Sequence, residues 1–264
     1  MSLVFGAISP HPPVVIPEIG GENLKQVKQT AQALKDLEED LYASKPDTII
    51  IISPHGIISP DNFLLNIAPH FSSNLEEFGD FKNKLEFSAD IQLASKIEEA
   101  AEDNSIPISL IDKPQLDHGV SVPLFFLTQH LPKVKIVPIS YCLLDWKTHL
   151  NFGQTIAHEI AQTNKRVAVI ASGDLSHSLK EGAPAGYSAE GKKFDQTLVK
   201  LLANNDIESI THLDSGLVEA ANECGLRSIL ILLGIFQNSN WQTRVISYEG
   251  PLGVGYLVAS LTLK

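Results

Sequence analysis

The chain has 264 residues, of which 44% are hydrophobic and 19% are charged, a composition typical of a globular protein with a large core. Its formal charge of −11, with 20 Lys and Arg residues scattered along the sequence, argues against binding to nucleic acid or anionic membranes. No apolar run approaches the length of a membrane span, and two cysteines are too few for a disulfide framework. We therefore expect one domain over residues 1–264 that acts in the reducing cytoplasm.

The first third of the chain predicts a strand, a loop, a helix and a second strand. Leu3 to Ile8 is a short apolar run, and the prolines after it predict an extended loop over Val14 to Pro17. Apolar residues from Leu24 to Leu41 recur at helical spacing. Residues 48–52 are all β-branched and cannot alternate a wet face with a dry one. They predict a central parallel strand covered by helices on both sides.

Strand and helix patterns continue to alternate in the rest of the chain. The sequence predicts strands at 63–68, 108–111, 134–141 and 166–172, and a C-terminal hairpin of 241–248 and 253–261. It predicts helices at 89–101, 120–129, 149–162, 189–202 and 217–236, the last broken near Gly225. This order predicts an α/β fold: a single three-layer α/β/α domain with a mostly parallel or mixed central sheet.

Histidines follow several of the predicted strands. The tetrapeptide Ile-Ser-Pro-His ends at His11 and occurs again ending at His55, while His118 precedes a glycine and His177 follows the strand at 166–172. Ligands of open α/β sheets bind beyond the carboxyl ends of the strands, so four imidazoles gathered there predict a metal site. We expect surface or packing roles for the other five histidines, which are His70, His130, His149, His158 and His212.

The remaining ligands decide which metal such a site would hold. Two neutral imidazoles and one carboxylate with open positions form the facial triad of non-heme iron, and the absence of a Cys-x-x-Cys pair disfavours structural zinc. Glu223 is the favoured carboxylate because it lies in a small and apolar segment, where a buried charge needs a partner or a metal. The alternative is that Glu223 stabilises the N-terminus of the following helix. The other candidate carboxylates are Asp174, Glu219 and Glu249.

Five motifs together carry a resemblance to a known family. The chain resembles the class III extradiol ring-cleaving dioxygenases, and more closely their catalytic B subunit (LigB-like) of the protocatechuate type with its Memo-like relatives. The resemblance covers nearly the whole chain in the same order, and so implies one LigB-like domain over residues 1–264. The motifs lie at 7–13, 53–56, 117–124, 172–177 and 222–225.

The resemblance implies a role for each site residue. His11, His55 and Glu223 would hold Fe(II), His177 would be the acid–base residue, and His118 would lie beside bound substrate and oxygen. Memo-like relatives use a cysteine near the carboxylate position, so the adjacent Cys224 is an alternative ligand. The implied reaction is extradiol cleavage of a catechol-type ring. Its partners would be a small aromatic diol and O2, and a homo-oligomer or a small partner subunit is compatible with the family.

Two other classes of function stay open. A Memo-like protein would bind a metal or a partner protein without cleaving a ring. A zinc-dependent hydrolase is the other alternative, because the same ligands also suit zinc, which can activate a bound water.

Overall fold

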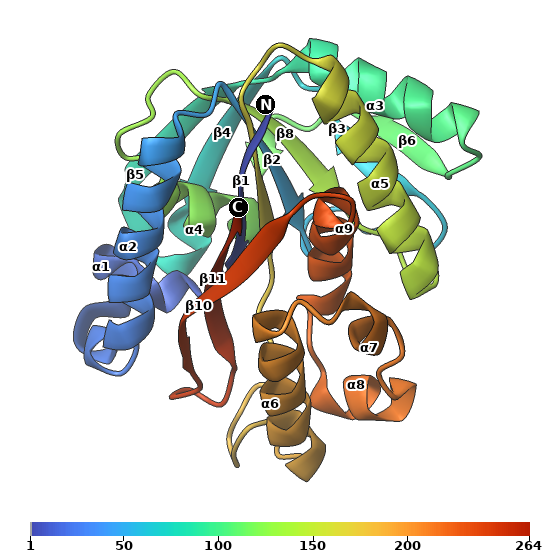
Figure 1. The fold of residues 1–264 in the computed structure, drawn as a ribbon. Coiled ribbons are helices and arrows are strands. Elements are labelled where there is room, and N and C mark those ends of the chain that lie inside the picture. Colours follow the sequence, from blue (N-terminus) through green and yellow to red (C-terminus); the bar gives the residue numbers. More distant parts are fainter. Residues whose placement is uncertain (1) are drawn as a thin grey trace.

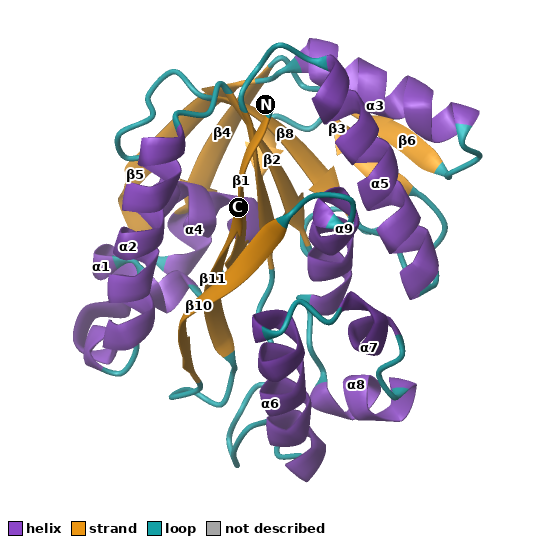
Figure 2. Ribbon diagram, in the orientation of Figure 1, coloured by secondary structure: helices purple, strands orange, loops and turns teal. Residues whose placement is uncertain are grey.

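A central eight-stranded sheet lies between two layers of helices (Figures 1 and 2). The computed structural model describes residues 2–264. In spatial order the strands are β10 (Trp241–Glu249), β11 (Tyr256–Leu263), β1 (Leu3–Ser9), β9 (Val167–Ser172), β2 (Thr48–Ser53), β8 (Lys135–Ser140), β3 (Phe63–Asn66) and β6 (Ile108–Ile111).

The sheet is mixed, with a parallel centre. β1, β9, β2 and β8 run parallel to one another, whereas β3 is antiparallel to β8 and β11 is antiparallel to β1. β10 and β11 form the predicted C-terminal hairpin. The α/β fold with a mostly parallel or mixed sheet is therefore confirmed.

The isoleucines of β2 explain why this strand is central. Ile50 and Ile52 are buried in the core on one face, and Ile49 and Ile51 are buried in the core on the other. Full burial of such a side chain contributes about 1.5–3 kcal/mol, so both faces gain from helix cover. One face packs against α3 (Ile91–Asp103), α5 (Trp146–Gln162) and α9 (Leu226–Phe236), and the other against α2 (Lys28–Ser44) and α4 (His118–Leu127).

A second, three-stranded sheet was not predicted. It consists of β4 (His70–Leu75), β5 (Asp80–Ser88) and β7 (Gln115–Leu116), in the order β5-β4-β7. Its strands carry few apolar residues, and β5 is largely exposed, so the sequence gives only a weak strand pattern here. His70 begins β4 and is exposed.

The short elements correct two other predictions. The extended loop at Val14 to Pro17 was wrong, because η1 (Pro13–Val15) and α1 (Pro17–Gly20) are helical turns that each begin at a proline, where the missing N–H is not needed. The helix expected from Leu24 begins only at α2, after η2 (Gly21–Lys25). The remaining helices are η3 (Glu76–Phe78), α6 (Ala189–Ala203), α7 (Ile207–Thr211) and α8 (Ser215–Ala221).

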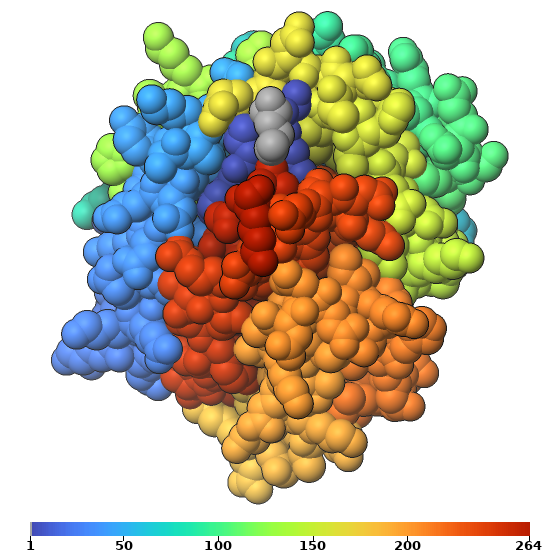
Figure 3. All heavy atoms as spheres, in the orientation of Figure 1, coloured from blue at the N-terminus to red at the C-terminus, as the bar shows by residue number. Residues whose placement is uncertain are grey.

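The break predicted near Gly225 is confirmed. Asn222 ends α8 in the left-handed conformation, with a φ of 51°, and α9 begins three residues after Glu223. In the space-filling view, the C-terminal part of the chain, coloured orange to red, covers the centre and the lower part of the visible face (Figure 3). Within residues 2–264, no helix is both long and apolar enough to cross a bilayer.

Candidate metal centre

Two histidines meet at the carboxyl edge of the sheet. His11 follows β1 and His55 follows β2, the two strands that flank β9. Their Nε2 atoms are 2.9 Å apart and their ring planes are nearly perpendicular. The repeated strand-end motif thus brings two imidazoles to one point, as the parallel arrangement of the strands requires.

A third imidazole, that of His118, lies beside these two. Asp117 caps α4 by accepting hydrogen bonds from the Val120 N–H (3.2 Å) and the Ser53 hydroxyl (2.7 Å), which ties the start of α4 to the end of β2. The ring centroid of His118 lies 4.1 Å from that of His55. One ring nitrogen from each of His11, His55 and His118 lies within 4.8 Å of the others. The three side chains can therefore share one ion.

The environment keeps the two strand-end imidazoles neutral. Burial lowers the pKa of His11 well below its ordinary value, and the neighbouring His118 and His177 lower it further. Burial and the other histidines lower the pKa of His55 to about 3. The Nδ1 atom of His11 lies 2.9 Å from the Ser172 hydroxyl oxygen at the end of β9. Neutral rings with a free nitrogen lone pair are the form in which histidine binds metals.

Asp174 and Cys224 border the His11 ring. Asp174 is buried, and its Oδ1 accepts the backbone N–H of His11 (3.0 Å) while its Oδ2 lies 3.8 Å from His11 Nε2. Burial raises the pKa of the Asp174 carboxyl to about 6. The Sγ atom of Cys224 lies 3.8 Å from His11 Nε2, and burial raises the pKa of this thiol well above its ordinary 9.0. A buried thiol of this kind stays protonated unless a metal ion binds the sulfur and the proton is released.

The predicted ligand Glu223 contacts a helix end in this structure. Its Oε2 accepts the backbone N–H of Leu226 (2.5 Å) in the first turn of α9, and burial raises the pKa of its carboxyl to about 7. The three-histidine group does not include Glu223. Of the other candidate carboxylates, Glu219 is exposed and Glu249 accepts hydrogen bonds from the backbone and hydroxyl of Thr30. The choice between Glu223 and Cys224 as a ligand stays a prediction.

His177 lies on the loop after β9 and contacts the end of α8. Its Nδ1 atom is 2.6 Å from the backbone oxygen of Asn222. Because a carbonyl oxygen can only accept, Nδ1 carries the proton and Nε2 of the neutral ring is left with the lone pair. This is the tautomer that a general base needs.

The five histidines set aside lie outside the three-histidine group. His149 is buried, with its two nitrogens near the backbone oxygens of Asp145 and Cys142, and so has a packing role. The supporting contacts from Ser53, Asp117 and Ser172 were not predicted as such, although each residue lies in or next to a strand-end motif.

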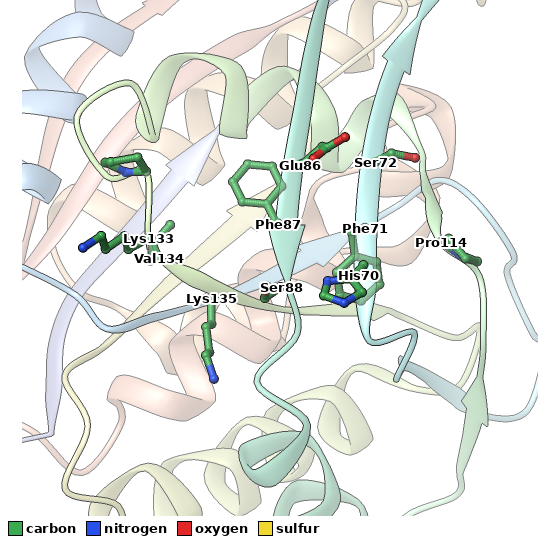
Figure 4. A pocket seen from close by; sticks show the side chains of 11 residues that line it. His70, Phe71, Ser72, Glu86, Phe87, Ser88, Pro114, Lys133, Val134 and Lys135 are labelled. Atoms are coloured by element: carbon green, nitrogen blue, oxygen red, sulfur yellow. The ribbon is translucent and has the colours of Figure 1, made fainter.

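Two cavities differ in their position relative to the three clustered histidines. A hollow of about 480 Å³ lies between β4, β5 and the segment 132–135, and its lining includes His70 but none of the three clustered histidines (Figure 4). A smaller cavity of about 210 Å³ is bordered by Ser53, Gly56 and Asp117, the neighbours of His55 and His118. The smaller cavity therefore adjoins the metal centre, whereas the larger one lies at the start of β8, toward the amino edge of the sheet.

Comparison with known proteins identifies the class of protein. The model of a family described as the catalytic LigB subunit of aromatic ring-opening dioxygenase matches residues 6–259. The chain therefore belongs to this family, and the resemblance of its motifs to the LigB-like catalytic subunits is confirmed.

Individual relatives add detail. The chain is 34% identical over 270 residues to Protein CA_C1420 of Clostridium acetobutylicum, a match that covers 99% of the chain but 58% of that protein. It is 28% identical over 160 residues to the 2,3-dihydroxyphenylpropionate/2,3-dihydroxicinnamic acid 1,2-dioxygenase of Escherichia coli, covering 56% of the chain and 51% of the enzyme. The chain thus spans little more than half the length of each relative. The crystal structure of the uncharacterized protein JW3007 from Escherichia coli K12 shares the fold, with a TM-score of 0.68 over 97% of the chain and 99% of that protein, at 16% identity.

Proposed function

We propose that the protein is a non-heme Fe(II)-dependent extradiol dioxygenase that cleaves a catechol-type aromatic ring with O2. The observation that carries the proposal is the meeting of His11, His55 and His118 at the carboxyl edge of the sheet, in a chain of the LigB family. The proposal includes one LigB-like domain over residues 1–264 and a cytoplasmic setting.

The donor atoms fit a metal ion. Neutral imidazole nitrogens are common donors to divalent metals, and they must lie close together to bind the same ion. The Nε2 atoms of His11 and His55 are separated by 2.9 Å. In the metal-free chain the same distance suits a hydrogen bond between one ring N–H and the other ring nitrogen. Imidazole suits iron and zinc alike, so zinc is the alternative metal.

The proposed reaction divides the work among four residues. His11 and His55 would hold the iron, with Glu223 or Cys224 as the third ligand. Ferrous iron, when bound, would supply open coordination positions and a path by which electrons of the diol reach O2. His177 takes the proton of a substrate hydroxyl at Nε2 and returns it later, while its Nδ1–H stays on the Asn222 carbonyl.

His118 has a supporting role in this proposal. Its ring lies 4.1 Å from that of His55, and the Phe78 ring lies 5.2 Å from it. A donor held in this way can stabilise negative charge that develops on the oxygen substrate. His118 also offers a nitrogen within reach of the same ion, so removing it should affect both metal binding and turnover.

The decisive experiment combines metal analysis with oxygen uptake. The protein is purified without air, its bound iron and zinc are measured, and O2 consumption is followed with a panel of catechols before and after loading with ferrous salt and ascorbate. Iron-dependent O2 uptake with formation of a ring-opened product supports the proposal. A protein fully loaded with iron that opens no catechol in the panel contradicts it.

A second candidate is a Memo-like metal-binding protein without ring cleavage. It is favoured by one observation: Cys224 Sγ lies 3.8 Å from His11 Nε2, whereas the Glu223 carboxylate binds the N–H of Leu226. Cys224→Ser and Glu223→Gln form a matched pair, because each changes one of two adjacent candidate ligands. Loss of metal in Cys224→Ser alone supports the thiolate site, and loss in Glu223→Gln alone supports the facial triad of the dioxygenases.

A further inference from the structure

Asp195 is a buried carboxylate that the proposed chemistry does not use. It lies on α6, which packs against α8 and β10 (Figure 1). Its Oδ1 accepts the backbone N–H of Ser176 (2.8 Å), and its Oδ2 accepts the hydroxyl of Tyr248 (2.6 Å). Both oxygens are thus satisfied, as burial of a carboxylate demands. One of the two partners is the residue directly before His177.

The C-terminal end of α8 also binds the loop that carries Ser176 and His177. The Ala221 backbone oxygen accepts the N–H of His177 (3.0 Å) and the hydroxyl of Ser176 (2.9 Å). The next carbonyl, that of Asn222, accepts Nδ1–H of the His177 ring (2.6 Å). The carbonyls at the C-terminal end of a helix lack partners within the helix, and here the His177 loop provides them. The orientation of the ring therefore depends on where Ser176 is held.

Gly255 leaves space for the Asp195 carboxylate. The Leu175 N–H donates to the Gly255 oxygen and the Gly255 N–H donates to the Ser176 oxygen, both at 2.8 Å. A Cβ atom at Gly255 would collide with Oδ2 of Asp195. The segment before β11 can approach both the loop and the carboxylate only because residue 255 has no side chain.

We propose that Asp195 is a positioning residue for His177. Through the Ser176 N–H it fixes the loop against the end of α8, so that Nδ1–H of the His177 ring stays on the Asn222 carbonyl and Nε2 keeps its lone pair free to accept a proton. Tyr248 in turn fixes the carboxylate. The inference rests on the acid–base role of His177 in the proposed function, but the tautomer of the ring can be measured without any reaction.

The test uses the whole chain with Asp195→Ala, Asp195→Asn and a control. Asp90→Ala is the matched control, because Asp90 is also buried but binds Lys165 and Thr48 at the amino edge of the sheet. The tautomer of the His177 ring is read by 15N NMR of the metal-free protein. Its signals are assigned with His177→Gln.

The expected result is specific to Asp195. Wild type and Asp90→Ala should show His177 protonated at Nδ1, whereas Asp195→Ala should show a mixture of the two tautomers. Asp195→Asn should resemble wild type, because its amide oxygen can still accept the Ser176 N–H. In the iron-loaded protein, Asp195→Ala should lower kcat about 10- to 100-fold with little change in KM, because a small misplacement of a catalytic group has an effect of this size.

Other results would contradict either the role of Asp195 or the proposed function. If Asp195→Ala keeps the wild-type tautomer at His177, Asp195 is only a core residue and the inference is wrong. If Asp195→Ala does not fold, Tyr248→Phe carries the same test, since it removes only the hydroxyl that holds Oδ2. If the wild type opens no ring, the proposed function fails, and the NMR result still decides the role of Asp195.

Discussion

The pH dependence of stability tests whether the Glu223 carboxyl is buried at the N-terminus of α9. In the metal-free protein, burial raises its pKa from 4.5 to about 7. The folded state then binds this proton more tightly than the unfolded state does. The stabilising contribution is complete below pH 4.5 and is lost as the pH rises through about 7. Because one pKa unit corresponds to about 1.4 kcal/mol, the loss is roughly 3 kcal/mol at most.

Glu223→Gln should remove this pH dependence. Glutamine keeps an oxygen for the Leu226 N–H and does not ionise. In urea unfolding of the metal-free proteins, we expect equal stability at about pH 4, and a variant more stable than wild type by up to about 3 kcal/mol at about pH 8.5. If the free energies of unfolding of the two proteins differ by the same amount at every pH in this range, the carboxyl group is not buried as described and the reasoning fails.

Adding metal at the higher pH extends the same experiment. A ligand that binds only the folded state stabilises it by about 4.1 kcal/mol at a thousand times its Kd, which exceeds the deficit of about 3 kcal/mol expected for the wild type. If Glu223 is a ligand, metal should stabilise the wild type more than Glu223→Gln and reverse their order. If the order does not change, Glu223 is a helix cap and Cys224 becomes the favoured third ligand.

Three further predictions follow from the geometry of the centre. His177→Gln should lower turnover by about 10²- to 10⁴-fold at unchanged metal content, measured by O2 uptake and elemental analysis; loss of metal would make His177 a ligand. His55→Ala should lower bound metal, whereas His158→Ala, at an exposed histidine of α5, should not; equal metal content in both variants would exclude His55 as a ligand. Asp117→Ala should lower the free energy of unfolding by about 1–2 kcal/mol in urea, because α4 loses its cap, and an unchanged value would contradict that role.

The sequence predicted the parts of the fold that repeat a strong pattern. The β-branched run that forms β2 has both faces buried, so no alternation was needed to recognise it. The strand ends in turn predicted that His11 and His55 would meet, because parallel strands present their carboxyl ends at the same edge. At β2 and at the two strand-end histidines, the local sequence pattern therefore agrees with the arrangement of the strands in the sheet.

Other features depend on tertiary packing that a local pattern does not encode. The hairpin of β4 and β5 is built mainly from polar residues, and its few apolar residues, such as Phe71, Leu75 and Phe87, are buried by neighbours that are distant in the sequence. The place of His118 depends on the Asp117 cap and its contact with Ser53, far away in the sequence. Glu223 and Cys224 are adjacent, so only the turn between α8 and α9 decides which side chain faces His11.

The centre draws its residues from almost the whole length of the chain, and this has a consequence for biosynthesis. His11 and His55 are 44 positions apart, and His11 and Cys224 are 213 positions apart. Contacts between such distant residues form late in folding, because long loops must close first. A nascent chain therefore has no assembled centre until α9 has left the ribosome. Metal loading should follow folding as a single late step, and chains truncated before Cys224 should be made without bound metal.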